Sequence, residues 1–260
     1  MKKSKNIFWM LSLFIIAFYS CSNENVSSQK LLQKMVETTE DGLSETTLFA
    51  YDGNKITSIN SPNSRTDFTY TDGLISKIVL MNKKNKVKEI IEYSYDLGNL
   101  VQVESEGKYV IKYIHNPDKT IAYERFSSTT NNQIRKEYHG ILSIENGNLM
   151  YDKRIFDNVK EGLIVKNNRN FKYDQKINPM LDIFGFEKLL TCDDLMSVNN
   201  SLMSIVEDST IYPNDQITSS AKMHITFFKY DFAGYPIEKV SETALLSNGK
   251  TGYLKTEYFY

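Results

Sequence analysis

The chain has little of what builds a disulfide-rich, metal-binding or nucleic-acid-binding protein. It contains two cysteines and three histidines among 260 residues. Two cysteines cannot form the disulfide framework of a small secreted domain, and the histidines lack the HxH or HExxH spacing of a zinc site. Lys+Arg is 31 and Asp+Glu is 32, so no basic excess favours nucleic acid. We therefore expect no metal, no cofactor and no nucleic-acid partner.

Sequence motifs of the common catalytic folds are also missing. No GxSxG elbow, GxGxxG fingerprint or Walker loop occurs. Cys192 has no histidine near it in sequence and is typical of a small buried residue. The acidic pairs Asp193-Asp194 and Glu207-Asp208 could in principle act on a glycosidic bond, which needs two carboxyl groups, but adjacent acids are more often solvated. The sequence therefore predicts a non-enzymatic protein.

The first twenty residues differ from the rest. A basic start (Lys2, Lys3 and Lys5) precedes a 13-residue apolar run at residues 7–19. A membrane-spanning helix needs about 20 apolar residues, so this run is typical of a signal peptide. It ends in Ser20-Cys21, a small residue before a cysteine, and this end resembles a bacterial lipobox, although Phe18-Tyr19 departs from the usual pattern. The resemblance implies lipidation of Cys21; an ordinary cleaved signal and an uncleaved anchor are the alternatives.

Lipidation would hold a soluble domain at a bilayer surface through acyl chains, without a spanning helix. Ser22, rather than Asp, follows the cysteine, which in the general sorting pattern favours the outer membrane over the inner one. Residues 22–29 are polar and aperiodic, a tether of roughly 26 Å when extended at about 3.3 Å per residue. The expected organisation is a signal peptide at 1–20, the lipidated cysteine and tether at 21–29, and a single β-repeat domain at 30–260.

A hairpin-like unit recurs from about residue 45. In one copy Ile91, Tyr93 and Tyr95 alternate with polar residues, which is the period-2 mark of a half-buried strand. Asp96 can then accept backbone hydrogen bonds in a turn, and Gly98 can adopt the positive φ that a tight turn requires. The copies span residues 48–59, 68–78 and 91–103, with weaker ones at 111–118, 144–149, 171–174 and 227–237.

Repeats of this length, each with strand periodicity, predict successive antiparallel hairpins that form an all-β meander. The polar face of each strand indicates that one side of the sheet is wet. We therefore expect a curved open sheet, with a β-sandwich or a closed barrel as the alternative.

Residues 178–190 interrupt the pattern. The segment lacks alternation and begins with Asn178-Pro179, a helix-start signal, whereas Gly185 argues against a long helix. The expectation is one short helical insert near 179–200, a short helix or two turns at 179–190 that continues to about 200, whose apolar residues pack as a plug on the buried face of the sheet. The alternative is that they line a ligand pocket, and the candidate lining residues are then Phe184, Phe186, Leu189 and Leu190.

The unit at residues 68–78 resembles the YD repeats of Rhs-type and teneurin-type proteins. The order of lipobox, degenerate YD-like units, Asn178-Pro179 segment and late Gly234-Tyr235-Pro236 unit resembles a group of uncharacterised Bacteroidetes-type lipoproteins with degenerate YD (Rhs-like) repeats. This resemblance covers most of residues 30–260. Large YD-repeat proteins build closed shells, but about eight units are too few for one. The lipoprotein group supplies no catalytic residue to carry over.

These observations predict a lipid-anchored protein of the cell envelope, at the periplasmic face or the cell surface of the outer membrane. Its expected role is that of a non-enzymatic interaction or structural module, with the membrane as one partner and an envelope protein or glycan as another. The alternatives are a carrier that shelters a hydrophobic ligand under the 179–200 segment, and an envelope hydrolase.

Overall fold

The computed structural model describes residues 30–128, 134–157, 159–190, 196–245 and 251–260. Within these residues the chain forms sixteen strands and one 3₁₀ turn. The elements are β1 (Lys34–Thr39), β2 (Ser44–Asp52), β3 (Lys55–Asn60), β4 (Ser64–Thr71), β5 (Leu74–Asn82), β6 (Lys88–Asp96), β7 (Asn99–Ser105), β8 (Tyr109–His115), β9 (Thr120–Ser128), β10 (Ile134–Glu145), β11 (Asn148–Phe156), β12 (Ile164–Ile177), η2 (Phe186–Lys188), β13 (Asn199–Ile211), β14 (Ile217–Tyr230), β15 (Pro236–Leu245) and β16 (Thr251–Phe259).

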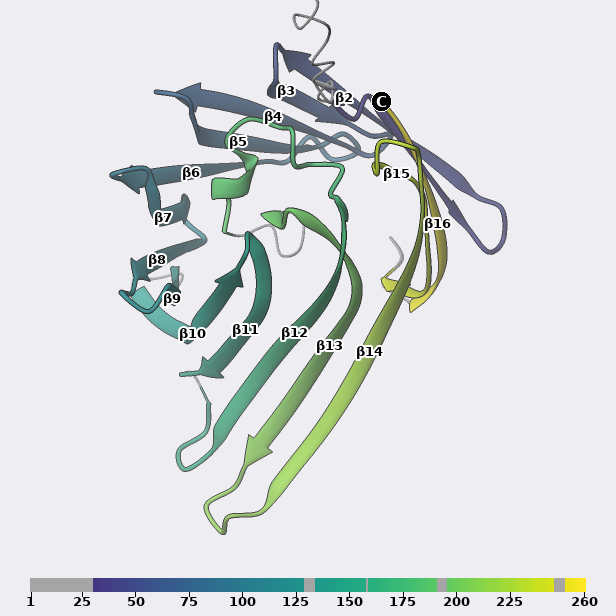
Figure 1. Ribbon diagram of the computed structural model, residues 1–260. Coiled ribbons are helices and arrows are strands. Elements are labelled where there is room, and N and C mark those ends of the chain that lie inside the picture. The colour runs from purple at the N-terminus through teal and green to yellow at the C-terminus, as the bar shows by residue number, and fades with distance from the viewer. Residues whose placement is uncertain (1–29, 129–133, 158, 191–195, 246–250) are drawn as a thin grey trace, which may run out of the picture.

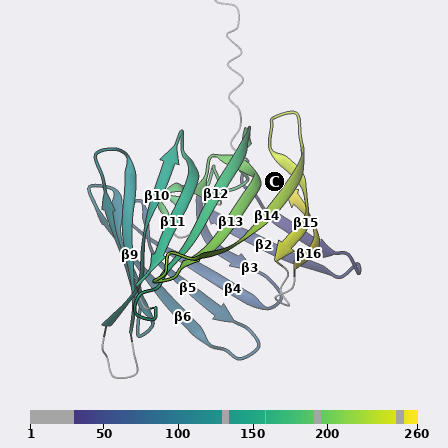
Figure 2. The ribbon, with the colours of Figure 1, turned by 90° about the horizontal axis from the view of Figure 1, so that it is seen from below.

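The strands form one closed antiparallel barrel in sequence order, and the pairing of β1 with β16 closes it. Figure 2 shows the strands encircling a central space. The predicted meander of successive hairpins is confirmed. The expected open sheet is wrong, and the closed barrel, the alternative, is what forms. Closure supplies hydrogen-bond partners for the two edge strands, which an open sheet would leave unpaired.

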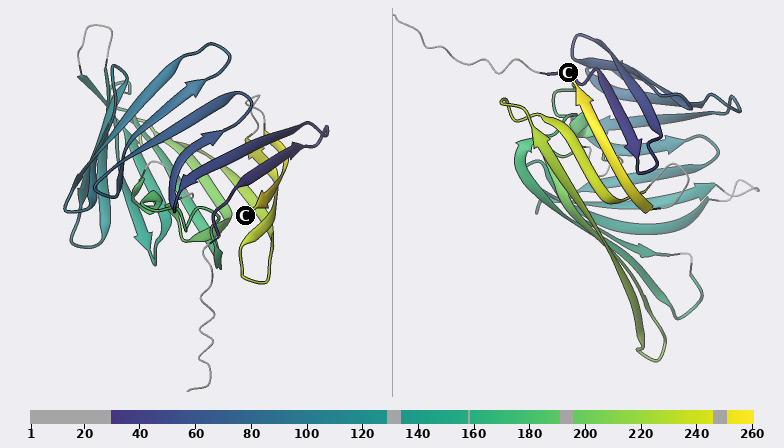
Figure 3. Two further views of the ribbon diagram at one scale, coloured as in Figure 1. Left: turned by 90° about the horizontal axis from the view of Figure 1, so that it is seen from above. Right: turned by 90° about the vertical axis from the view of Figure 1, so that its right-hand side faces the viewer.

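The two ends of the barrel differ. Because neighbouring strands are antiparallel, alternate connections lie at the same end. One end, named here the terminal end, holds Lys30, Tyr260 and every second turn from β2–β3 to β14–β15. The opposite end, named the distal end, holds the intervening turns, every second one from β1–β2 to β13–β14. The long strands β12, β13 and β14 extend beyond their neighbours at the distal end (Figures 1 and 3, right).

The turns of the recurring unit lie at the terminal end. Between β6 and β7, Leu97 and Gly98 have φ of 48° and 79°, the two positive values that a type I′ hairpin turn needs. The prediction that Gly98 adopts a positive φ is confirmed.

Tyrosines of the unit connect one hairpin to the one before it. The Tyr95 hydroxyl donates to the backbone oxygen of Ile75 over 2.9 Å, and the Tyr173 hydroxyl donates to that of Leu149 over 2.7 Å. Each such bond contributes about 0.5–1.5 kcal/mol net. Tyrosine therefore recurs for its hydroxyl as well as for the apolar bulk that the sequence pattern indicates.

The hydrophobic core lies inside the barrel. In β6 the side chains of Ile91 and Tyr93 are buried, whereas Glu92 and Ser94 between and beyond them are exposed. The same alternation in the other strands gathers Phe49, Ile56, Ile75, Val103, Ile111, Tyr113, Leu142, Phe171 and Tyr258 in one cluster. Most of the apolar mass of the sheet therefore faces the lumen.

The segment between β12 and β13 enters the barrel at the terminal end (green in Figure 1). Ile183, Phe186 and Leu189 are 1%, 5% and 0% exposed and belong to the core cluster, so the segment packs as a plug. Of the expected short helix or two turns, its described part forms turns that end in η2, with Gly185 in the left-handed conformation before η2. Residues 191–195, with Cys192 and the Asp193-Asp194 pair, lie outside the described residues.

Charged side chains lie at mid-strand on the outer face of many strands. Glu92, Lys112 and Lys255 are the central residues of β6, β8 and β16, and each lies between two inward-facing neighbours. Cross-strand pairing brings Lys77, Glu92 and Glu104 into one row across β5, β6 and β7. Further outward charges are Lys153, Lys172, Glu242 and Glu257. Exposed apolar side chains are interspersed with these charges, as Leu48, Ile90, Ile114, Ile141 and Ile155, and three more lie along β14, as Met223, Ile225 and Phe227.

No helix among the described residues is long and apolar enough to cross a membrane.

Candidate functional site

A cavity of about 270 Å³ lies inside the barrel between the plug and the distal end. Its walls come from the inner faces of β8 to β12, with one residue from the plug segment. The lining residues are Tyr109, Ile111, Tyr113, Tyr123, Arg125, Tyr138, Leu142, Leu149, Asp152, Arg154, Arg169 and Leu190. Apolar residues lie toward the plug, and charged residues toward the middle and distal parts of the strands, so the cavity is polar toward its distal side.

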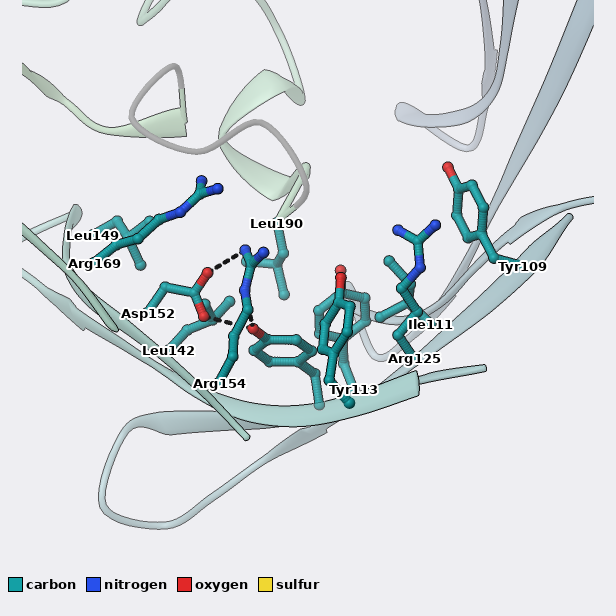
Figure 4. Close-up of a pocket in the computed structure, with 12 residues that line it drawn as sticks. Tyr109, Ile111, Tyr113, Arg125, Leu142, Leu149, Asp152, Arg154, Arg169 and Leu190 are labelled. Atoms are coloured by element: carbon teal, nitrogen blue, oxygen red, sulfur yellow. Dashed lines mark hydrogen bonds and ion pairs between the residues drawn. The ribbon is translucent and has the colours of Figure 1, made fainter. Parts of the chain in front are cut away.

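A buried ion pair organises the middle of the cavity wall. The Arg154 guanidinium binds the Asp152 carboxylate, whose side chain is only 3% exposed. The Tyr123 hydroxyl donates to Asp152 over 2.5 Å and accepts from Arg154 Nε over 2.8 Å. Arg169 is the direct cross-strand neighbour of Asp152 on β12. One carboxylate therefore holds both an arginine of its own strand and a tyrosine of β9 (Figure 4).

A second arginine lies nearer the distal end. Arg125 Nε donates to the Glu137 carboxylate over 2.7 Å, and the guanidinium lies 4.1 Å from the centre of the Tyr109 ring. The Tyr138 ring has its centre 5.9 Å from Arg125 and 5.4 Å from Arg154, so it lies between the two guanidinium groups. Such contacts between a guanidinium and a ring face favour a fixed arginine orientation.

A glycine makes room for the central tyrosine. Gly140 on β10 pairs with Tyr123 on β9, and a Cβ atom at Gly140 would lie 2.6 Å from Tyr123 ring atoms and 2.6 Å from the backbone oxygen of Lys153. The Tyr123 ring therefore crosses directly over the β10 backbone to reach the Asp152 carboxylate on β11. An isolated glycine inside a strand often marks such a close approach.

Burial and the Asp152 carboxylate shift the pKa values of two residues in this wall. Burial opposes the charge of Arg154, but the Asp152 carboxylate outweighs burial and raises the pKa of Arg154. Burial and the same carboxylate raise the pKa of Tyr123, which therefore stays a neutral donor. Three guanidinium groups face two carboxylates, Asp152 and Glu137, so this wall carries a net positive charge.

Of the ligand-lining candidates from the sequence, one lines this cavity. Leu190 borders it at the plug, whereas Phe186 and Leu189 are buried in the core around it. Phe184 is 44% exposed at the terminal end, where its ring packs beside Gly73. Cys21 lies outside the described residues.

The structure separates one of the candidate acidic pairs. Glu207 and Asp208 are consecutive in β13, so their side chains point to opposite faces of the barrel wall. Asp208 accepts a hydrogen bond from Asn167 on the inner side. The two carboxyl groups therefore cannot act on one bond together. Among the described residues, no group of three His, Cys, Asp or Glu side chains is placed to hold a metal ion.

Sequence reasoning did not identify the arginines, Asp152 or Gly140 as members of one site. Arg154 and Arg169 come from the paired strands β11 and β12, and Arg125 on β9 lines the same cavity because the sheet curves around one lumen. The available signals were weak. They were the lone Gly140 within a strand and the pair Asp152 and Arg154, whose spacing of two places both on the inward-facing side of β11.

Comparison with known proteins gives matches at the level of the fold. No family model and no curated protein matches the chain. Among solved structures, a porin-like protein from Bacteroides vulgatus ATCC 8482 superposes with a TM-score of 0.56 at 12% identity, covering 89% of this chain and 99% of the other. A porin-like protein from Bacteroides uniformis ATCC 8492 superposes with a TM-score of 0.50 at 10% identity, covering 87% and 95%. The chain therefore shares its fold with these porin-like barrels.

Proposed function

We propose that this protein is a non-enzymatic binding module of the cell envelope, in which a closed β-barrel stands in water at a membrane surface and is held there by a lipid on Cys21. The single observation that carries the proposal is the set of charged side chains at mid-strand on the outer wall. It is supported by the signal-like start of the chain and by the interior cavity.

The outer wall has the wrong polarity for a lipid-facing surface. A membrane barrel presents an apolar band to lipid and polar residues to its lumen. Here the apolar core faces the lumen, while Lys112 and Lys255 lie at mid-strand on the outside. Each of these lysines would cost about 2–4 kcal/mol at the midplane of a bilayer. The porin-like fold therefore does not imply insertion of this wall into a membrane.

The lumen supports binding rather than passage. The plug packs Ile183, Phe186 and Leu189 against inward side chains of the strands toward the terminal end. The cavity lies toward the distal end, which is the end opposite the tether that leads back from Lys30 to Cys21. A ligand would enter from the side that faces away from the membrane. The charged lining gives the hydrophobic-carrier alternative no support.

The proposal predicts that Cys21→Ser moves the protein from the membrane fraction to the soluble fraction and abolishes metabolic labelling with a fatty acid. The expected result follows because the lipid alone attaches the protein to the membrane, and the charged wall does not. Cys192→Ser is the matched control and should stay in the membrane fraction with full labelling. Cys21→Ser protein that remains membrane-bound at high salt would contradict the proposal.

A further inference from the structure

We infer that the cavity between β8 and β12 binds a small organic oxyanion carried on a ring, such as a ring-borne carboxylate or phosphate. This inference rests on the proposed binding function and adds the chemical class of the ligand. It comes from the arginines, the tyrosines and the size of the cavity.

The arginines provide the oxyanion site. Figure 4 shows the guanidinium groups of Arg125, Arg154 and Arg169 projecting from neighbouring strands to the same side of the wall. Asp152 and Glu137 each occupy only part of the five N–H donors of the arginine they bind. The planar fork of a guanidinium matches a carboxylate or phosphate through paired hydrogen bonds. An anion here would also be favoured by the net positive charge of the wall.

The tyrosines and two leucines provide the surface on which a ring could pack. The Tyr113 and Tyr123 rings lie 6.1 Å apart at a tilt of 37°, and the Tyr123 and Tyr138 rings meet edge to face at the same distance. Leu142 on β10 and Leu190 of the plug add apolar surface to the lining. Flat or alicyclic rings pack on such faces, and the Tyr109 and Tyr113 hydroxyl groups can bond polar ring substituents.

The volume limits the ligand to about one ring. Sites for drug-sized ligands are roughly 300–1,000 Å³. This cavity, at about 270 Å³, lies just below that range, and a neighbouring space is lined by Arg125, Glu137, Tyr138 and Phe156. A long acyl chain matches neither the charged lining nor the volume of this cavity.

Equilibrium binding to the purified full-length protein in mild detergent tests the inference. Glucuronate and glucose 6-phosphate are the anionic probes, and glucose is their neutral counterpart. We expect at least one anionic probe to bind ten-fold or more tightly than glucose, with an affinity that falls as salt increases. The stronger of the two identifies the oxyanion as carboxylate or phosphate.

Two variants assign the binding to this wall. Arg125→Gln and Arg169→Gln should each lower the affinity for the anionic probe ten-fold or more. Arg65→Gln, which removes an exposed arginine from the outer face, should leave this affinity unchanged. Arg154 is left intact because its loss would unpair buried Asp152. Equal or tighter binding of glucose would overturn the oxyanion class and leave the binding function standing. Absence of binding by all three probes, or equal weakening by Arg65→Gln, would overturn the site itself. Neither result bears on the Cys21 experiment.

Discussion

Replacing Asp152 by alanine should lower the free energy of unfolding by about 3–5 kcal/mol, because it leaves a buried arginine without its carboxylate. The Asp152 side chain is 3% exposed and accepts hydrogen bonds from Tyr123 and Arg154. Its removal leaves the Arg154 guanidinium, which is 21% exposed, without a counter-ion and also removes the negative charge on the strand next to Arg169. Chemical denaturation followed by far-UV circular dichroism measures the loss.

The matched control for Asp152→Ala is Asp67→Ala on the outer wall. Asp67 pairs with Arg65 over 2.8 Å, but both side chains are more than 40% exposed, so this ion pair should contribute little. Asp152→Asn keeps one acceptor oxygen for Tyr123 and should fall between wild type and Asp152→Ala. If Asp152→Ala unfolds at the same denaturant concentration as Asp67→Ala, the Asp152–Arg154–Tyr123 network does not organise the wall.

Replacing Gly140 by alanine should destabilise the barrel by about 1–3 kcal/mol and displace the Tyr123 ring. The new Cβ would lie 2.6 Å from the ring and from the Lys153 backbone oxygen, and the backbone on one side of this contact cannot move without disturbing the β10–β11 pairing. The hydrogen bond from Tyr123 to Asp152 should therefore be lost together with the stability.

Near-UV circular dichroism reports the displacement directly. If the signal peptide is removed, Trp9 leaves with it and the tyrosines dominate this spectrum. Ser94→Ala, an outward position on β6, is the control for an alanine in a strand and should keep the wild-type spectrum. A Gly140→Ala protein with wild-type stability and an unchanged tyrosine signal would show that the close approach of Tyr123 is not required.

The local structure of this protein follows from its sequence, whereas its closure does not. The alternation at Ile91 and Tyr93 and the glycine at position 98 predict the β6–β7 hairpin, and the structure contains it. Alternation shows that one face of a strand is buried, but the outside of a barrel and the wet side of an open sheet have the same pattern. Closure depends on whether β1 and β16 meet, and no local signal in either strand encodes that contact.

The candidate site was less predictable than the fold. Residues 178–190 were expected to form a plug because they are apolar and lack alternation, and they do pack in the core. The segment forms turns and no long helix, and Gly185, from which this was predicted, adopts a left-handed conformation within it. The charged wall on the distal side of the plug could not be predicted, because Arg125 and Arg154, taken one at a time, resemble solvated strand residues. Only the curvature of the barrel turns them toward the same cavity.

The central claim is that the outer wall of this barrel faces water, and thiol labelling at mid-strand tests it most directly. Lys112→Cys in a Cys192→Ser background places a single reactive thiol at the middle of β8 on the outer face, since Cys21 is acylated in this account. Val103→Cys, at a position that is 0% exposed inside the barrel, is the control that should stay unlabelled. In broken membranes, a membrane-impermeant maleimide should label Lys112→Cys as fast as it does after detergent extraction. Protection in membranes that detergent abolishes would place the wall in lipid and contradict the account.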